Sequence, residues 1–440
     1  MNKRLDEIVV FANKQAFAKR LEDLRRKLVR AAMFESAGEN EAQLRRIIRQ
    51  VAEFGDTALA ELTEQFDNVA LKPNQFRIST DEMKKAASEV DPQLLSSLLR
   101  AADNVKKYQN EIFIANRFDL NSHPGIRYLP IKKIGICVPG ASAPLPSTVI
   151  MTAVPAMVAG VKEITVVSPP RYNNTIHPVI LAVCFELGIR TVYRIGGAQA
   201  VAALAYGTDT VAKVDKIVGP GSRWVQMAKK EVFGVVDVDS IAGPSEVVII
   251  ADKTAHPDWV AADMLSQAEH DPGSAVLLTD SKRLAKDVLT ELKNQLKKLA
   301  RAEQTETSLL EFSSIVVLDN LDKAIETAND FAPEHLEIQC GHKSDKTAQK
   351  IENAGAVFIG DYTPVAVGDY WAGPSHTLPT GTTARFFSAL TANDFIKSTS
   401  ITRYDQKQLS ENADHIIRLA QAEGLDAHAR SVQIRQQHNG

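Results

Sequence analysis

Hydrophobic residues in the first third of the chain recur every three or four positions among many charged ones. This spacing lines the apolar side chains along one face of a helix, so it predicts amphipathic helices over residues 12–33, 40–66 and 81–112. The charged residues between them would form the solvated faces. The chain is therefore expected to begin with a largely helical third.

The pattern changes near residue 126, where short runs rich in β-branched residues begin to alternate with stretches of helical length. The runs KKIGICVPG, KEITVVSPP, TVYRIGG and VDKIVGPG each contain Gly or Pro at their end, and each precedes a helical stretch. A second series follows, consisting of SEVVIIAD, SAVLLTD, SSIVVLD, HLEIQ and GAVFIGD. Repeated strand–helix units predict parallel sheets, and two such series predict two successive α/β cores.

The last 50 residues return to a helical pattern that Gly424 interrupts. A segment of this size cannot bury a core of its own. Residues 390–440 are therefore expected to pack on the body of the protein or on a second subunit.

Composition narrows the classes of protein that the pattern allows. The 440 residues are 44% hydrophobic and 24% charged, with a net charge of −3, which excludes a disordered chain and gives no positive field for nucleic acid or an anionic membrane. The longest apolar run, 149–161, is shorter than the roughly 20 residues of a bilayer span and contains Pro155.

The ends and the cysteines favour a cytoplasmic protein. MNKRLDEIVV has no long apolar core, so we expect no signal peptide. Cys137, Cys184 and Cys340 are odd in number, lie far apart and lack metal-site spacing. They are expected to be reduced, mostly buried thiols.

One candidate metal motif is SQAEHD, at the end of a helix expected between Pro257 and Pro272. Gln267 and His270 are three residues apart, so an amide oxygen and an imidazole can reach one metal ion from one helical face. A short motif of this kind more often matches by chance than it marks a site. A capped helix end with a solvated histidine is the structural alternative.

A second candidate is the adjacent pair Glu334 and His335, at the start of a predicted strand. A carboxylate beside an imidazole can divide acid–base work. Neighbours on a strand point to opposite faces, so the pair serves one site only if it lies in the turn before the strand. A purely structural role is the alternative.

Two further segments supply candidate metal ligands, and several glycine-containing loops supply backbone N–H groups. Asp369 follows the strand GAVFIGD, where α/β folds carry functional loops, and His428 lies in the tail with Glu423. Gln, His, Asp and His without cysteine suit zinc, with manganese or cobalt as alternatives. Glycine-bearing strand exits let amides approach a phosphate, but no GxGxxG follows a strand, so this signal for a nucleotide is weak.

As a set, these segments resemble histidinol dehydrogenase over nearly the whole chain. The matching text includes GASAPLPSTVIMTAVPAMVAGV, RIGGAQAVAALAYGT, VDKIVGPG, AGPSEVVIIAD, DMLSQAEHD, PEHLEI, YTPVAVGDYWAGPSHTLPT and AHARS. The resemblance implies a zinc-dependent homodimer with two incomplete Rossmann-like domains and helical N-terminal and C-terminal extensions. It implies oxidation of L-histidinol to L-histidine, the last step of histidine biosynthesis, through bound histidinal with two NAD.

The resemblance also implies a division of the chain. Residues 1–33 would form a helical extension, and residues 34–137 with 245–389 would form a discontinuous domain for substrate and metal. Residues 138–244 would form the NAD-binding domain. The tail, 390–440, would contact the second subunit and share its active site.

Roles follow for individual residues by the same resemblance. One zinc ion per subunit would be held by Gln267, His270, Asp369 and His428. His335 would take the alcohol proton in the first oxidation, and Glu334 would activate water in the second. The substrate pocket would consist of these four ligands and His335 together with Ser245, His376 and Glu423. The cofactor contacts would be Cys137, Gln199 and Ser222.

Four positions depart from the family pattern. At the positions of Cys137 and Ser222 the family usually has Tyr and Asn. The smaller side chains of this chain predict weaker binding of NAD. It commonly has Glu at Val365 and Asn at Ser375. These departures leave open a paralogous NAD-dependent dehydrogenase of another small polar alcohol, such as a sulfonated propanediol. A zinc hydrolase and a binding protein without activity are the alternatives from other classes.

Overall fold

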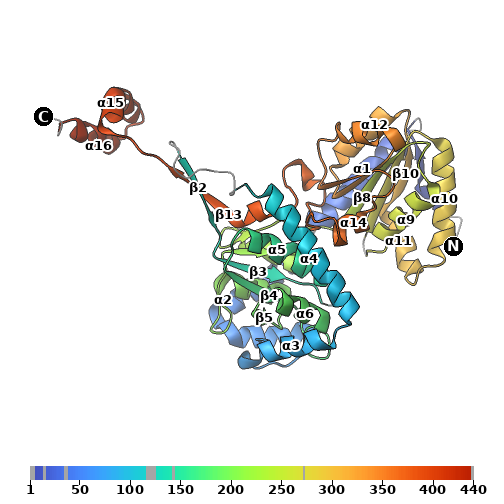
Figure 1. Cartoon of the computed structure of the whole chain (residues 1–440), viewed down its shortest axis with the longest axis horizontal. Helices are drawn as coiled ribbons and strands as arrows, with labels where there is room; N and C mark the ends of the chain where they lie inside the picture. Colours follow the sequence, from blue (N-terminus) through green and yellow to red (C-terminus); the bar gives the residue numbers. More distant parts are fainter. Residues whose placement is uncertain are drawn as a thin grey trace. The chain divides into compact units, whose positions relative to one another are not determined.

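The computed structural model describes residues 5–12, 16–33, 38–114, 125–140, 144–270 and 273–437. The chain forms two compact units (Figure 1). Unit 1 comprises Met1–Phe113 and Pro130–Phe395, and unit 2 comprises Ile114–Leu129 and Ile396–Gly440. Unit 1 contains two parallel sheets, so the predicted α/β class with two parallel-sheet domains is confirmed.

The first sheet has the strand order β5-β4-β3-β6-β7, with all neighbours parallel. Its strands are β3 (Lys133–Cys137), β4 (Glu163–Val167), β5 (Thr191–Tyr193), β6 (Lys216–Val218) and β7 (Asp237–Val238). They alternate with α5 (Pro146–Val158), α6 (Pro178–Glu186), α7 (Gly197–Tyr206) and α8 (Arg223–Val232). From β3 the chain adds β4 and β5 on one side of the sheet, and then β6 and β7 on the other side of β3. This reversal of strand order opens a crevice at the carboxyl ends of β3 and β6.

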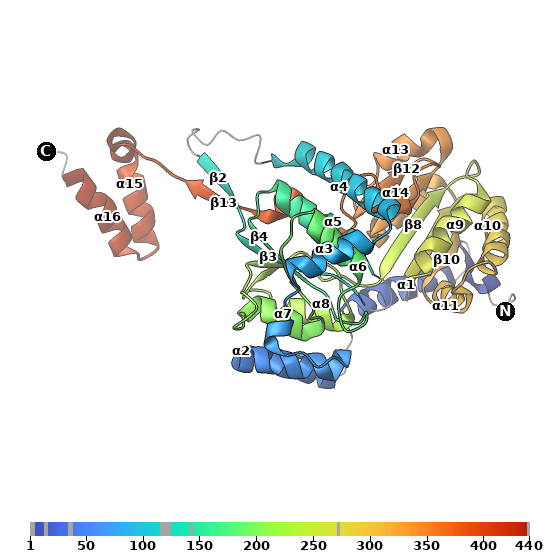
Figure 2. The same ribbon diagram turned by 60° about the horizontal axis from the view of Figure 1, so that its bottom comes forward.

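The helices of the first third cover this same sheet. They are α2 (Gly38–Asp67), α3 (Thr80–Glu89) and α4 (Pro92–Ile112), which contact α7, α6 and α5 respectively (Figure 2). The expected grouping of 34–137 with 245–389 is therefore wrong for the described residues, because β3 and these helices pack with β4 to β7. The helix expected over 81–112 is also two helices, since Asp91 caps α4 and Pro92 starts it.

The second sheet has the order β1-β10-β9-β8-β11-β12 and is also parallel throughout. Its strands are β1 (Val9–Phe11), β8 (Ser245–Ala251), β9 (Gly273–Thr279), β10 (Ser314–Val317), β11 (His335–Gln339) and β12 (Ala356–Ile359). The expected N-terminal helical extension is thus partly wrong. Residues 9–11 form an edge strand, and α1 (Ala16–Met33) follows it.

Side chains of the second sheet alternate between two cores. Val247 and Ile249 of β8 face α9 (Pro257–Ala268), α10 (Lys282–Leu296) and α11 (Ala302–Phe312). Val248 and Ile250 face α12 (Leu321–Phe331) and α1. Because His335 pairs in register with Val247, its side chain points to the same face as Val247, toward α9.

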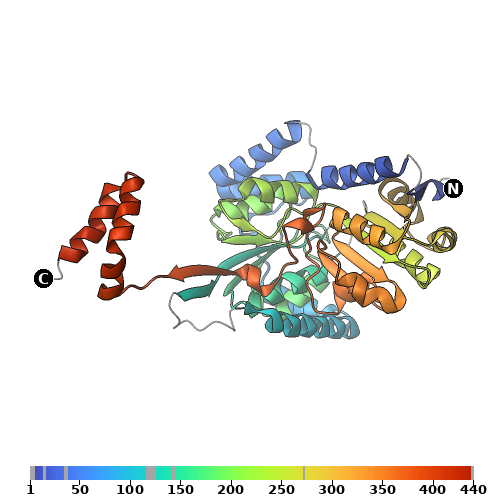
Figure 3. The same cartoon turned by 90° about the horizontal axis from the view of Figure 1, so that it is seen from above.

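Unit 2 consists of a two-stranded sheet and two helices. β2 (Gly125–Pro130) pairs with β13 (Ile396–Ile401), and α15 (Gln406–Ala422) packs beside α16 (Asp426–Gln437) (Figure 3). Gly424, with φ +71°, makes the turn between the helices. None of the helices described in this structure is both long and apolar enough to cross a bilayer.

Candidate active site

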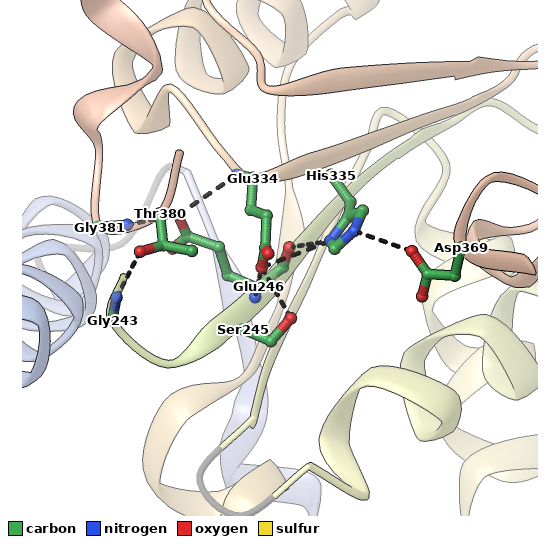
Figure 4. A network of polar contacts seen from close by, with 8 residues as sticks. All are labelled: Gly243, Ser245, Glu246, Glu334, His335, Asp369, Thr380 and Gly381. Carbon is green, nitrogen blue, oxygen red and sulfur yellow. Dashed lines mark hydrogen bonds and ion pairs between the residues drawn. The ribbon is translucent and has the colours of Figure 1, made fainter. Parts of the chain in front are cut away.

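The candidate acid–base residues lie at the amino edge of the second sheet. Ser245 begins β8, Glu334 directly precedes β11, and His335 is the first residue of β11. Asp369 comes after the carboxyl end of β12, where a functional loop is expected. The short helix α14 (Val365–Tyr370) instead brings its Oδ1 within 3.6 Å of His335 Nε2 at the opposite edge (Figure 4).

His335 is held in one orientation by the backbone of the neighbouring strand. Its Nδ1 lies 3.0 Å from the carbonyl oxygen of Glu246. A carbonyl oxygen only accepts, so Nδ1 carries a proton and, in the neutral ring, Nε2 keeps the lone pair. Nε2 has no hydrogen-bond partner among the residues that the structure describes. The ring is therefore held with Nε2 facing Asp369 Oδ1 at 3.6 Å, and only the neutral ring can accept a proton at this nitrogen.

Glu334 shares this site because it precedes the strand. Its Oε2 accepts from Ser245 Oγ at 2.7 Å and from the Glu246 N–H at 2.9 Å, and it lies 3.5 Å from His335 Nδ1. The geometric condition for a joint role of Glu334 and His335 is thus met. Both side chains are buried.

Burial and neighbouring charges shift both groups. Burial raises the pKa of Glu334, while the charge of His335 and the hydrogen bond from Ser245 lower it in part. Burial by itself would lower the pKa of His335, but the carboxylates of Glu334 and Asp369 outweigh it and raise this pKa to about 9. A cation bound by Asp369 would cancel part of that attraction and lower the pKa of His335.

Glu246 is a central residue that sequence reasoning missed. Its Oε1 accepts from the Gly381 N–H at 3.0 Å and from the Glu334 N–H at 3.3 Å, and its backbone contacts both Glu334 and His335 (Figure 4). Burial, and then the charge of Glu334, raise the pKa of Glu246 to about 8. A charged residue inside the apolar run SEVVIIA is the signal that would have identified it.

The segment after α14 lies against the same site. His376 is partly buried near Asp369 and His335, and its burial lowers its pKa. Ser375, where the resembled family has Asn, is a structural contact, because its hydroxyl donates to the Met151 carbonyl at 2.9 Å. The Thr380 hydroxyl accepts from the Gly243 N–H at 2.6 Å. This hydrogen bond joins the segment after α14 to the residues that lead into β8.

The candidate metal ligands are only partly brought together. α9 ends at Ala268, so Gln267 is in its last turn and His270 lies just beyond. The charges of Asp369 and Glu269 both act on Tyr370, whose pKa is raised mainly by burial, so the end of α9 lies beside α14. Asp271 and Pro272, from the predicted motif, lie outside the described residues.

Within the described ranges, no three His, Cys, Asp or Glu side chains are grouped so that they hold a metal ion. His428 belongs to unit 2, where it and Glu423 are exposed. Gln267 nevertheless fits a ligand role, since it is 2% exposed and its Nε2 has no partner in the described part of the chain, a place that the amide oxygen takes when the amide is rotated by half a turn. An amide oxygen, a carboxylate and imidazoles form a donor set that suits zinc.

A cavity of about 210 Å³ lies at the carboxyl edge of the first sheet, where the crevice is expected. Gln199 and Ser222 both line it, together with Ile47, Phe66, Asp67, Arg171, Gly197, Ala198 and Trp224. The Arg171 Nε donates to Asp67 Oδ1 at 2.7 Å. Neither Arg171 nor Asp67 was a sequence candidate, since nothing near them in the sequence marks a site.

Cys137 does not line this cavity. Its side chain is 5% exposed within the core of the first sheet, and burial raises the pKa of its thiol to about 12. Its carbonyl group instead shapes the neighbouring loop. Gly219 has φ +103°, and a Cβ there would lie 2.4 Å from the Cys137 carbonyl oxygen. Two hydrogen bonds hold Gly219 in place. Lys229 Nζ donates to the Gly219 carbonyl at 3.0 Å, and the Gly219 N–H donates to Asp239 at 2.7 Å.

We predict that Gly219→Ala weakens binding at this cavity. The added Cβ forces the loop that leads to Ser222 to move, because the backbone atoms it meets cannot yield. The resemblance implies that NAD contacts Gln199 and Ser222, which line this cavity, so the dissociation constant of NAD, measured by calorimetry, should rise by about tenfold or more, corresponding to roughly 1.4 kcal/mol. Gly188→Ala is the control, since Gly188 has φ +77° with open space around it. An equal rise in both variants would contradict the assignment.

Comparison with known proteins places these features in context. The protein family described as histidinol dehydrogenase matches residues 31–436. A histidinol dehydrogenase of Rhodopirellula baltica is 47% identical over 393 residues, covering 88% of this chain and 85% of the relative. One of Thermosynechococcus vestitus is 43% identical over 424 residues, covering 95% and 98%.

A solved structure of the same family is also similar to this chain. The crystal structure of histidinol dehydrogenase from Elizabethkingia anophelis is 33% identical to this chain and superposes with a TM-score of 0.89. The similarity covers 98% of each chain. It therefore extends over the residues of both compact units.

Proposed function

Because the chain belongs to the histidinol dehydrogenase family, we propose that it oxidises L-histidinol to L-histidine through bound histidinal, using Glu334 and His335. It is an NAD-dependent oxidoreductase of an alcohol and an aldehyde, as the resemblance implied, and its family binds zinc. One observation carries the assignment of residues. His335 is fixed by the Glu246 carbonyl with its Nε2 3.6 Å from Asp369 Oδ1, and Glu334 is beside it.

His335 would act in the first oxidation. The hydroxyl proton of histidinol passes to Nε2 of the neutral His335 ring, a form that a cation on Asp369 would favour, while the carbon loses a hydride. NAD, when bound, accepts that hydride, and we place its contacts at Gln199 and Ser222 in the cavity of the first sheet. The Nδ1 contact with Glu246 keeps the ring oriented throughout.

Glu334 would act in the second oxidation. Burial raises its pKa, which makes the carboxylate a stronger base near neutral pH. It takes a proton from water, the oxygen adds to the aldehyde carbon, and the resulting hydrate loses a hydride to a second NAD. Ser245 and the Glu246 N–H hold the carboxylate in place during this step.

Zinc would be held by Gln267, His270, Asp369 and His428, and when bound it supplies the positive charge that anchors nitrogen donors of the substrate. His376 lies close to Asp369, and Ser245 close to Glu334, so both are placed to contact the substrate. Glu423 would reach the substrate from the tail. Retention of a carboxylate and imidazoles favours an amine and imidazole substrate over a sulfonated diol.

We propose a homodimer in which the tail completes the neighbouring site. Unit 2 carries Glu423 and His428 and, among the described residues of α15 and α16, buries only Ala413, Ala420 and Ala429. It exposes Leu419, Leu425 and Ile434, apolar side chains that a partner surface would cover. A cytoplasmic location is proposed on the three buried free thiols.

The overall test of the function is an assay of NADH formation. The enzyme should reduce NAD with L-histidinol and form two NADH per histidine. Other amino alcohols and the sulfonated diol should react at least tenfold more slowly. Faster turnover of a diol would favour the paralogous dehydrogenase.

The acid–base pair should separate the two half-reactions. His335→Asn removes the base and should slow oxidation of the alcohol by about 10²- to 10⁴-fold. Glu334→Gln should slow oxidation of added histidinal more than that of histidinol, because only the aldehyde step needs activated water. Stopped-flow measurement of each half-reaction checks this, and equal damage to both halves by both variants would overturn the division.

Metal content should depend on His270. His270→Ala removes a ligand, so zinc per subunit, measured by plasma emission after gel filtration, should fall well below one. His256→Ala, at the exposed start of α9, is the matched control and should keep its zinc. Full zinc occupancy in His270→Ala would remove this residue from the ligand set.

Mixing of two inactive variants tests the shared site. A His428→Ala subunit and a His335→Asn subunit should regain activity after exchange, because one site of the heterodimer then carries both defects and the other carries neither. If each tail serves its own subunit, every site keeps one defect and mixing restores nothing. Heterodimer formation is verified with two affinity tags. Verified heterodimers without recovered activity would reject the shared site.

A further inference from the structure

A pair of carboxyl groups, one buried and one partly buried, lies between the elements of the site and is not used by the proposed mechanism. Asp263 of α9 and Glu337 of β11 are hydrogen-bonded to each other. The Gln339 Nε2 donates to Asp263 Oδ2 at 2.7 Å and to Glu337 Oε2 at 3.2 Å. Glu337 is 1% exposed, so the contact is removed from water.

Two carboxyl groups in hydrogen-bond contact away from water share one proton, since two negative charges there would repel each other. Burial, and then the charge of Asp263, raise the pKa of Glu337 well above its ordinary value. Glu337 therefore holds the proton and donates it to Asp263. Its other oxygen, Oε1, accepts from the Val365 N–H at 2.9 Å.

These hydrogen bonds join three elements, α9, β11 and α14. Each element carries a site residue a few positions away from the residue that takes part in the hydrogen bonds. Asp263 is four residues before Gln267, which is one turn along the same face of α9. Glu337 is two residues after His335, so both side chains point to the α9 face of β11.

The third element is α14. Val365 is its first residue and lies one turn before Asp369. The Val365 side chain is apolar and buried, so only its N–H joins the polar network. A single cluster therefore links the elements that carry an amide ligand, a carboxylate ligand and the base.

We propose that the hydrogen-bonded pair Asp263 and Glu337 is a positioning device, which fixes Gln267 and Asp369 at the separation that one zinc ion requires and holds both in place beside His335. This inference rests on the proposed function, because it takes the zinc ligands from it. Neither residue of the pair contacts the substrate. Partners behind metal ligands typically change metal affinity by about 10- to 100-fold when they are removed.

The test compares zinc affinity, measured by competition with a chromophoric chelator, in variants of the full-length enzyme. Glu337→Met keeps the length of the side chain, but it leaves Asp263 bonded to Gln339 alone and the Val365 N–H without an acceptor. Its zinc affinity should fall by about 10- to 100-fold. Glu337→Gln places a neutral donor where the protonated acid stands, so it should stay within about threefold of the parent. Rescue by glutamine distinguishes positioning from bulk packing.

Asp252→Asn is the matched control. Asp252 is also buried in the second sheet, at the end of β8, and it bonds to Thr254 and Lys343 rather than to a site element. This variant should lose thermal stability without losing zinc affinity. The Michaelis constant for L-histidinol should rise in Glu337→Met and stay unchanged in Asp252→Asn.

If Glu337→Met does not fold, Val365→Pro decides. Proline removes the N–H, keeps an apolar side chain at this buried position and is suited to the first position of a helix. Its zinc affinity should fall by at least severalfold. Parental affinity in whichever of the two variants folds would overturn the positioning role. The proposed function fails separately, if the parent enzyme binds no zinc or His270→Ala keeps it.

Discussion

The parallel pairing of β8 with β11 is the constraint on which the rest of the site depends. Its register places His335 opposite Val247, so the entry to β8 meets the entry to β11. The backbone of Glu246 then reaches both members of the acid–base pair, through its N–H to Glu334 and its carbonyl to His335. A shift of one residue would turn His335 to the α12 side and separate it from Asp369.

The candidate site residues of the two sheets lie at opposite edges, the carboxyl edge of the first sheet and the amino edge of the second. In the first sheet, Gln199 and Ser222 follow the carboxyl ends of β5 and β6, as a reversal of strand order favours. In the second, Ser245 and His335 stand at the amino ends, and α9 and α14 return Gln267 and Asp369 toward them. A helix after a parallel strand runs back along the sheet, so its last turn lies near the edge where the strand began.

The strength of the local pattern explains what the sequence predicted. Continuous apolar runs such as SEVVIIAD and SAVLLTD predicted the central strands, which are buried on both faces. Val9–Phe11 is too short to show periodicity, and β2 with β13 is too exposed to show an apolar face. Of the site, helical spacing made Gln267 and His270 a candidate pair, which the family resemblance assigned to zinc, whereas Glu246 and Asp263 owe their surroundings to contacts between distant segments.

The place of β1 has a consequence for how the protein is made. Val9 pairs with Ile315, and the Ser314 hydroxyl bonds to the Ile8 carbonyl across 306 positions of sequence. A ribosome releases the first segment long before its partner strand exists, so the edge of this sheet closes late in synthesis. Contacts of such separation slow folding, because a long loop must be closed before they form. The amino-terminal strand therefore joins a sheet that the rest of the chain has already begun to build.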